Sequence, residues 1–197
     1  MAVLNVTPDS FSDGGRYAGL DAAVARAERM VEEGAAIVDV GGESTRPGAS
    51  PVSVEEEIRR VVPVIERLVS RMAVPVSVDT SKPEVMRAAV DAGAQMINDV
   101  RALRAPGALA AAAASGSAVC LMHMRGEPAS MQSAPAYNDV IADVRTFLAE
   151  RVAACLSAGI PRQRICIDPG IGFGKLPEHN LALLAGLAGI GQRSLPI

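Results

Sequence analysis

The stretch VPVSVDTSKPEV (residues 74–85) contains the beginning of one β/α unit. Its apolar first half predicts a buried strand, and Asp79 stands where that strand ends. The S-x-x-E pattern from Ser81 to Glu84 predicts a helix N-terminus with Ser81 as the cap and Pro83 in the first turn. Because Ser81 supplies the cap, Asp79 is free for another role at the end of the strand.

The same pattern recurs along the chain. The expected strands are 2–6, 36–40, 74–78, 95–100, 118–122 and 165–168, and the expected helices are 21–33, 54–72, 83–92, 106–115, 139–158 and 178–187. Gly34, Gly93, Gly116 and Gly159 follow predicted helices where a left-handed cap is favoured. Apolar strands that alternate with helices predict a parallel sheet whose faces are covered, joined by right-handed crossovers.

Polar residues at the strand ends select between two architectures. Each predicted strand ends in one of Asn5, Asp39, Asp79, Asn98, His123 and Asp168. A doubly wound sheet would concentrate such residues at one switch point, whereas a barrel collects them from every strand. We therefore predict an α/β fold of the (β/α)8 TIM-barrel type.

The barrel is expected to be incomplete. Six strands are clear, and Leu195–Ile197 resembles the start of a seventh. A complete barrel typically needs about 250 residues. We expect residues 1–197 to form a single barrel domain that lacks the last two β/α units.

Composition excludes several classes of function. The 197 residues are 49% hydrophobic and carry a net charge of −3, without the basic patches that nucleic acids require. The longest apolar runs are far shorter than the roughly 20 residues of a membrane span, and no signal peptide is apparent. The three cysteines form no CxxC motif and lie in apolar segments. We expect a cytoplasmic protein without nucleic-acid or membrane partners.

Asp168 begins the segment DPGIGFGK, which has three alternating glycines. The carboxylate could simply accept hydrogen bonds from its own loop, as Asp before Pro-Gly often does. The glycines also permit close approach of the backbone to a ligand. The segment is not a P-loop, because Pro169 replaces the first glycine and Leu176 follows Lys175.

Three further features have both a structural and a functional interpretation. Asn98 could contact a ligand or link neighbouring strand ends. The loop of Thr45 and Arg46 could be solvated surface or a phosphate site, to which Asn5 would add an Mg²⁺ ligand. The methionines of residues 122–131 could fill the core or contact a flat heterocycle. Two histidines are too few for a typical zinc site.

Six stretches taken together resemble the dihydropteroate synthase family. They are LNVTPDSFSDGG, GGESTRPGA, SVDTSKPEV, INDV, CLMHMRGEP and DPGIGFGK, and they cover nearly the whole chain in order. The resemblance implies an enzyme of folate biosynthesis that joins 7,8-dihydropterin-6-ylmethyl diphosphate to 4-aminobenzoate. Dihydropteroate and diphosphate would be the products.

The resemblance also implies roles for individual residues. Asp79, Asn98, Met122 and Asp168 would bind the pterin, with Asp79 as the catalytic carboxylate that stabilises developing positive charge. Asn5 would ligate Mg²⁺ on the diphosphate, which Thr45 and Arg46 would hold, and Phe173 with Pro47 would shape the aminobenzoate pocket. The family's later S-R-K and R-x-H segments, which contact pterin and diphosphate, do not occur in this sequence. Family members are commonly homodimers, so a homodimer is expected.

Two rival functions remain at this point. A methyltetrahydrofolate-corrinoid methyltransferase is also a pterin-binding barrel, but it needs no diphosphate site. A pterin-binding chain without turnover is the second rival. The loops TPDSFSDGG and STRPGA favour the synthase.

Overall fold

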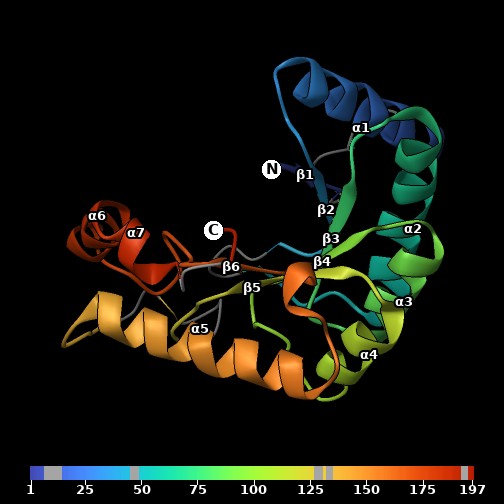
Figure 1. The fold of residues 1–197 in the computed structure, drawn as a ribbon. Coiled ribbons are helices and arrows are strands. Elements are labelled where there is room, and N and C mark those ends of the chain that lie inside the picture. The colour runs from blue at the N-terminus through green and yellow to red at the C-terminus, as the bar shows by residue number, and fades with distance from the viewer. Residues whose placement is uncertain (7–14, 45–48, 127–130, 132–134, 192–194) are drawn as a thin grey trace.

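The computed structural model describes residues 1–6, 15–44, 49–126, 131, 135–191 and 195–197 (Figure 1). Their strands form a single parallel sheet in the order β1-β2-β3-β4-β5-β6, so each strand pairs with its neighbours in sequence. The strands are β1 (Ala2–Asn5), β2 (Val38–Gly41), β3 (Val76–Asp79), β4 (Met96–Asp99), β5 (Ala118–Met122) and β6 (Ile165–Asp168). A doubly wound sheet reverses its order at a switch point, and this sheet does not. The barrel prediction is confirmed.

Helices follow the strands and line the outside of the curved sheet, as α1 to α4 do in Figure 1. They are α1 (Gly15–Glu32), α2 (Val54–Arg71), α3 (Pro83–Asp91), α4 (Ala108–Ser115), α5 (Val140–Ser157), α6 (Pro177–Ala185) and α7 (Leu187–Ile190), with a short 3₁₀ helix, η2 (Arg162–Arg164). The four predicted glycine caps all have positive φ. Within the described ranges, no helix is both long and apolar enough to cross a bilayer.

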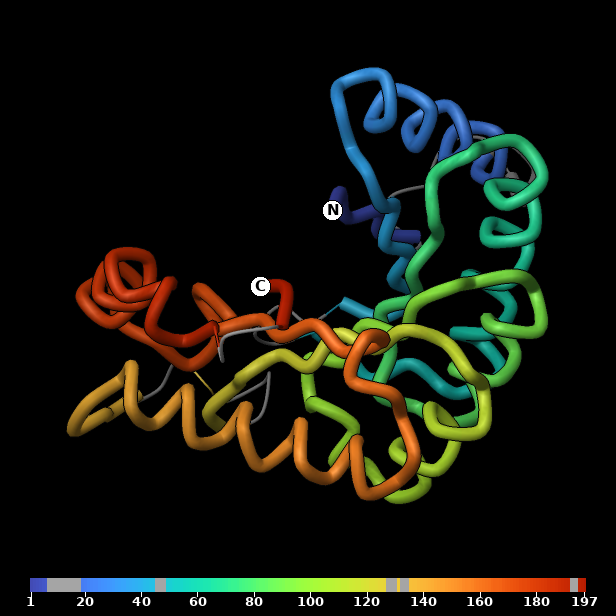
Figure 2. The backbone as a smooth tube through the Cα atoms, in the orientation of Figure 1, coloured from blue at the N-terminus to red at the C-terminus, as the bar shows by residue number. Residues whose placement is uncertain are grey.

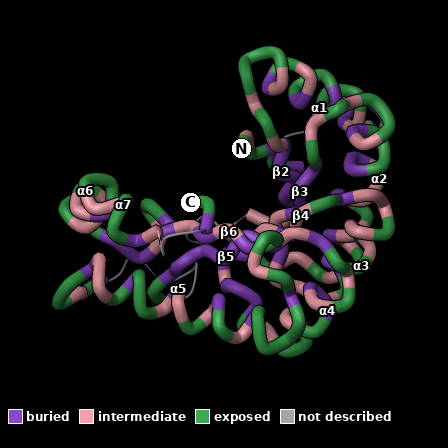
Figure 3. The backbone as a smooth tube through the Cα atoms, in the orientation of Figure 1, coloured by how far each residue is buried: buried purple, intermediate pink, exposed green. Residues whose placement is uncertain are grey.

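Each strand has one face toward the helices and one toward the inside of the arc. Side chains such as Val38, Val40, Val76 and Val78 lie in the main apolar core with the helices. The alternate positions, such as Asp39, carry polar groups on the inner face. Figure 3 shows the buried segments along the strands and the exposed ones on the outer turns of the helices.

The predicted cap of α3 is wrong. Lys82 is the N-cap and makes no side-chain cap hydrogen bond. Ser81 Oγ instead donates to the buried carboxylate of Asp99, a charged acceptor that the fold places beside it. In α2 the expected cap is present, because Ser53 Oγ accepts from Glu56 N at 3.2 Å.

The predicted seventh strand is represented by one backbone contact among the described residues. Ile167 N donates to Pro196 O at 3.0 Å, but residues 195–197 are not in strand conformation. Figure 2 shows this terminal segment beside the end of the sheet formed by β6. The outer edge of β6 is therefore the place where this segment pairs.

Candidate functional site

One row of residues crosses the inner face of the sheet. In-register partners on neighbouring parallel strands face the same side, and the pairing continues through all six strands. The row, in order from β1 to β6, is Asn5, Gly41, Asp79, Asn98, Cys120 and Cys166. Met122 and Asp168 also pair in register, two residues nearer the carboxyl ends of their strands. The sheet therefore brings together five predicted site residues: Asn5, Asp79, Asn98, Met122 and Asp168.

Gly41 separates two oxygen-bearing side chains of this row. A Cβ at Gly41 would lie 3.5 Å from Asn5 Oδ1 and 3.7 Å from Asp79 Oδ2. The amide oxygen and the carboxylate therefore both lie against the bare backbone of Gly41. The absence of a side chain there keeps the space in front of both oxygens open.

Asn98 is oriented by a carboxylate on a distant strand. Its Nδ2 donates to Asp39 Oδ2 at 2.9 Å, and Asp39 is buried. Burial raises the pKa of Asp39, and the hydrogen bond from Asn98 acts in the opposite direction. The structural interpretation of Asn98 as a link between strands is therefore correct for its amino group. Its amide oxygen is the group that remains for a ligand.

Asp79 lies among other acids. Removal from bulk water raises its pKa well above the ordinary value, and the nearby carboxylates Asp39, Asp99, Glu57 and Glu43 raise it further. These neighbouring carboxylates disfavour a further negative charge on Asp79. A ligand that brings N–H donors or a cation would stabilise the ionised carboxylate.

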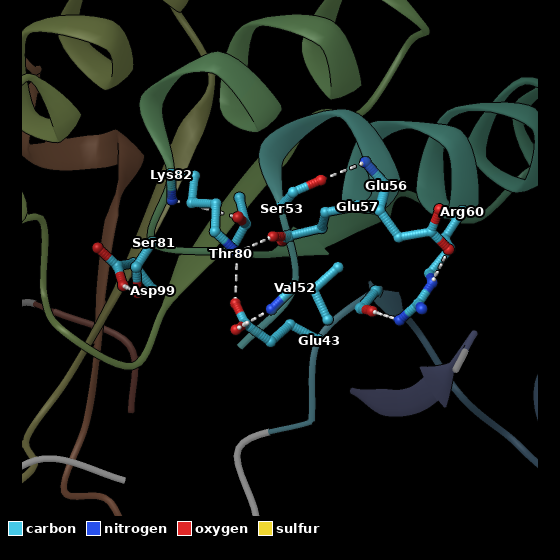
Figure 4. Close-up of polar contacts among 11 residues, drawn as sticks. Glu43, Val52, Ser53, Glu56, Glu57, Arg60, Thr80, Ser81, Lys82 and Asp99 are labelled. Atoms are coloured by element: carbon cyan, nitrogen blue, oxygen red, sulfur yellow. Dashed lines mark hydrogen bonds and ion pairs between the residues drawn. The ribbon is translucent and has the colours of Figure 1, made fainter. Parts of the chain in front are cut away.

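Lys82 joins two elements beside this acidic group (Figure 4). Its ammonium donates to Glu43, in the loop after β2, and to Glu57, a fully buried residue of α2. Glu43 Oε1 also accepts from Val52 N at 3.0 Å. This hydrogen bond connects the two ends of the loop between residues 43 and 52. Arg60 donates to Gly42 O at 2.9 Å. These contacts fix both ends of the loop to α2 and α3.

The middle of that loop carries three of the predicted site residues. Thr45, Arg46 and Pro47 lie outside the described residues. Their roles toward diphosphate and aminobenzoate therefore stay predictions.

A second lysine, Lys175, holds the loop after β6. Its Nζ donates to Gly170 O at 2.8 Å, Phe173 O at 2.9 Å and His123 O at 3.3 Å, and lies 3.0 Å from His123 Nδ1. Burial lowers its pKa to about 8. No role for Lys175 was predicted from the sequence. The one sequence feature that could have indicated a role is its position directly after the third glycine of the loop.

Asp168 both ties its loop and faces the site. Its Oδ1 accepts from Gly170 N at 2.7 Å, as the structural interpretation expected. Its backbone carbonyl accepts from His123 N at 2.9 Å. The first contact restricts the rotation of the carboxylate and the second fixes the backbone that carries it, while Asp168 remains partly exposed on the inner face.

An apolar cluster adjoins Asp168. Met122 is buried with Val100, Met124 and Met131, and Phe173 packs against them. This surface suits the flat face of an aromatic ligand. The methionine segment thus contributes to both the core and the inner face.

His123 does not belong to the inner face, although it ends a strand. Its ring meets Phe147 of α5 edge-on, with centroids 5.0 Å apart. Burial lowers its pKa to about 3, and the nearby Lys175 acts in the same direction. The imidazole is therefore neutral and supports the Lys175 contact from behind the sheet.

Comparison with known proteins identifies the family. The pattern of the family described as "Pterin binding enzyme" matches residues 1–197. The chain belongs to the pterin binding enzyme family.

Within this family the chain is similar to dihydropteroate synthases. That of Escherichia coli K12 is 55% identical over 197 residues, which are 100% of this chain and 70% of the relative. The Yersinia pestis dihydropteroate synthase, solved with a sulfonamide drug, superposes with a TM-score of 0.93 at 52% identity, over 100% of this chain and 71% of the other. The Xanthomonas albilineans enzyme, solved with 7,8-dihydropteroate, has a TM-score of 0.87 at 55% identity, over 100% and 69%.

Two glycines of the β6 loop provide a matched test of how tightly this loop is held. Gly170 and Gly172 both have positive φ, but a Cβ at Gly170 would lie 1.9 Å from His123 O, and one at Gly172 would meet open space. We expect Gly170→Ala to lower the free energy of unfolding by about 2–4 kcal/mol, through strain and overpacking together. Gly172→Ala should cost only about 1–2 kcal/mol, through the positive φ alone.

The two variants are compared by urea unfolding, followed by circular dichroism. Pterin affinity of the folded proteins, measured by calorimetry, should fall for Gly170→Ala because Asp168 loses its anchor. Equal effects of the two substitutions would contradict the tight contact between the β6 loop and the end of β5.

Proposed function

We propose that this chain catalyses the dihydropteroate synthase reaction. The amine of 4-aminobenzoate attacks the methylene carbon of 7,8-dihydropterin-6-ylmethyl diphosphate, a C–N bond forms, the C–O bond to diphosphate breaks, and the amine loses a proton. The observation that carries the proposal is that Asn5, Asp79 and Asn98 form one row on the same inner face as Asp168. The similarity to dihydropteroate synthases over the whole chain supports it.

The inner face suits a pterin because of its carboxylates. A pterin presents adjacent N–H donors along a planar edge, and a carboxylate such as Asp168 accepts two of them side by side. Asn98 would add its amide oxygen, since Asp39 occupies its amino group. Met122 and Phe173 would pack on the ring faces. Together these groups would fix the pterin with its reactive arm toward β1 and β2.

The chemistry needs electrostatic support rather than a strong nucleophile in the protein. Diphosphate is a good leaving group, and positive charge develops over the pterin as the C–O bond breaks. We propose that Asp79 stabilises this charge, because its neighbours already make an isolated negative charge unfavourable there. A cationic transition state would relieve that repulsion more than a neutral substrate does.

The donor set near Gly41 fits a magnesium ion. Mg²⁺ takes hard oxygen ligands, uses few from the protein, and keeps water or substrate phosphate at its other positions. Asn5, an exposed residue at the end of β1, has an amide oxygen of this kind, with the Asp79 carboxylate on the other side of Gly41. We propose that Asn5 holds the ion. Bound Mg²⁺ would neutralise charge on the departing diphosphate.

Residues of two loops complete the proposed site. Thr45 and Arg46 would hold the diphosphate, and Pro47 with Phe173 would border the aminobenzoate. The Lys82–Glu43 and Val52–Glu43 contacts would position the loop after β2 toward the substrates by fixing its ends.

The proposal is tested by replacing Asp79. With the pterin diphosphate, 4-aminobenzoate and Mg²⁺, Asp79→Asn should lower kcat by about 100-fold, because the variant cannot stabilise the developing cation. The measurement is the rate of dihydropteroate formation, and Asp91→Asn, at an exposed helix end, is the matched control.

Two outcomes would contradict the proposal in different ways. Near-normal turnover of Asp79→Asn would remove Asp79 from catalysis. Pterin binding in calorimetry without any product from the unsubstituted chain would support the rival of a pterin-binding chain without turnover.

A second variant tests the loop after β2. Glu43→Gln keeps an acceptor for Val52 N but loses the charge that attracts Lys82. We expect kcat/KM for the pterin diphosphate to fall about tenfold, equivalent to roughly 1.4 kcal/mol, mainly through KM. Steady-state kinetics measure the effect, with Glu66→Gln on the exposed side of α2 as the control. An unchanged KM would show that this contact does not position the loop.

A further inference from the structure

Two of the three cysteines lie side by side on the inner face. Cys120 of β5 and Cys166 of β6 are direct register partners. Neighbouring strands are about 4.8 Å apart, within the range of roughly 4.4–6.8 Å over which one small bridge joins two cysteines. Cys155 lies elsewhere, buried on α5 within the main core. The chain thus contains one adjacent thiol pair and one isolated thiol.

The two cysteines lie next to the proposed pterin site, on the side toward the amino ends of β5 and β6. Met122 and Asp168 follow the cysteines by two residues on the same strands, so all four side chains share a face. The intervening Leu121 and Ile167 point the other way, into the core. Cys166 is partly exposed and Cys120 is buried. The two thiols therefore belong to the inner face of the sheet, one side-chain position before Met122 and Asp168.

The thiols also interact with each other. A hydrogen bond between them raises the pKa of Cys120 and lowers the pKa of Cys166. Burial raises the pKa of Cys155 to about 11. Since the thiolate is the nucleophile and the soft-metal ligand, Cys166 is the favoured point of attack and Cys120 the adjacent second ligand.

We propose that Cys120 and Cys166 form a dithiol binding site for trivalent arsenicals, and that its occupation blocks the pterin. Two sulfurs that lie side by side on one sheet can both bond to the same thiophilic arsenic atom. The second bond is intramolecular and therefore forms at a high effective concentration. An adduct on the two sulfurs would project from the inner face into the space beside Met122 and Asp168. The blocking of pterin rests on the proposed function, whereas the arsenical site itself does not.

The reaction with phenylarsine oxide balances without an oxidant. The As=O bond breaks, one As–S bond forms to each cysteine, and the oxygen leaves as water with the two thiol hydrogens. Arsenic remains trivalent and no electrons are transferred. Each adduct consumes two thiols and one reagent molecule.

The site is tested by counting thiols. The reduced chain is treated with phenylarsine oxide, washed with an excess of a monothiol, unfolded, and titrated with a chromogenic disulfide reagent. The unsubstituted protein should fall from three free thiols to one, and Cys155→Ala from two to none. Cys120→Ala and Cys166→Ala should each retain two, because the monothiol removes a singly bonded arsenical. Intact mass should show one phenylarsenic group per chain, released by a dithiol.

A second measurement separates this site from the proposed function. Calorimetric titration with the pterin diphosphate should show at least tenfold weaker binding after treatment of the unsubstituted chain and of Cys155→Ala. Cys166→Ala should keep its own untreated affinity, and bound pterin should slow adduct formation. Three free thiols after treatment and washing would overturn the site, whatever the enzyme activity. An adduct that leaves pterin affinity unchanged would overturn the blocking.

Discussion

The register of the six parallel strands is the constraint on which the site depends. Side chains alternate between the two faces of a strand, so a slip of one residue would turn Asp79 toward the helices and Val78 toward the site. The valines and isoleucines that pack against the helices prevent that slip, because their burial is lost in any other register. The same apolar contacts that stabilise the sheet therefore place the polar row.

Burial of several acids around β2, β3 and β4 produces an electrostatic conflict that the chain resolves only in part. Asp39, Asp79 and Asp99 come from three adjacent strands, and Glu57 approaches from α2. Lys82 compensates Glu57 and Glu43, while Asp99 accepts hydrogen bonds from Ser81 Oγ and the backbone of Arg101 and Leu103. Asp79 has none of these partners in the described contacts, and its pKa stays raised. Its ionised form is the one that a pterin or a cation would stabilise.

Much of the fold follows from local patterns in the sequence. The strand that ends in Asp168, the glycine after α3 and the polar strand ends each depend on residues close together in the chain, so they were predictable. The Ser81 cap was wrong, and the hydroxyl instead donates to Asp99, 18 residues away. In the sequence, Glu57 looks like an ordinary exposed helix residue. In the structure it is completely buried, because Lys82 at the start of α3 pairs with its carboxylate. Such choices depend on tertiary distances that short motifs do not encode.

Two lysines hold the two loops that border the site, and they do so in different ways. Lys82 pairs with carboxylates that favour its ammonium form, so its pKa is raised although burial acts against it. Lys175 meets mainly carbonyl oxygens, which accept its protons but carry no full charge, and burial therefore lowers its pKa to about 8. The Lys82 anchor is a charge pair that a change in Glu43 weakens directly. The Lys175 anchor is geometric, because carbonyls of the β5 and β6 loops converge on one nitrogen. Asp168 and Phe173 thus keep their positions mainly through backbone contacts, and the nearby charge of Asp168 only partly opposes the lowering of the Lys175 pKa by burial.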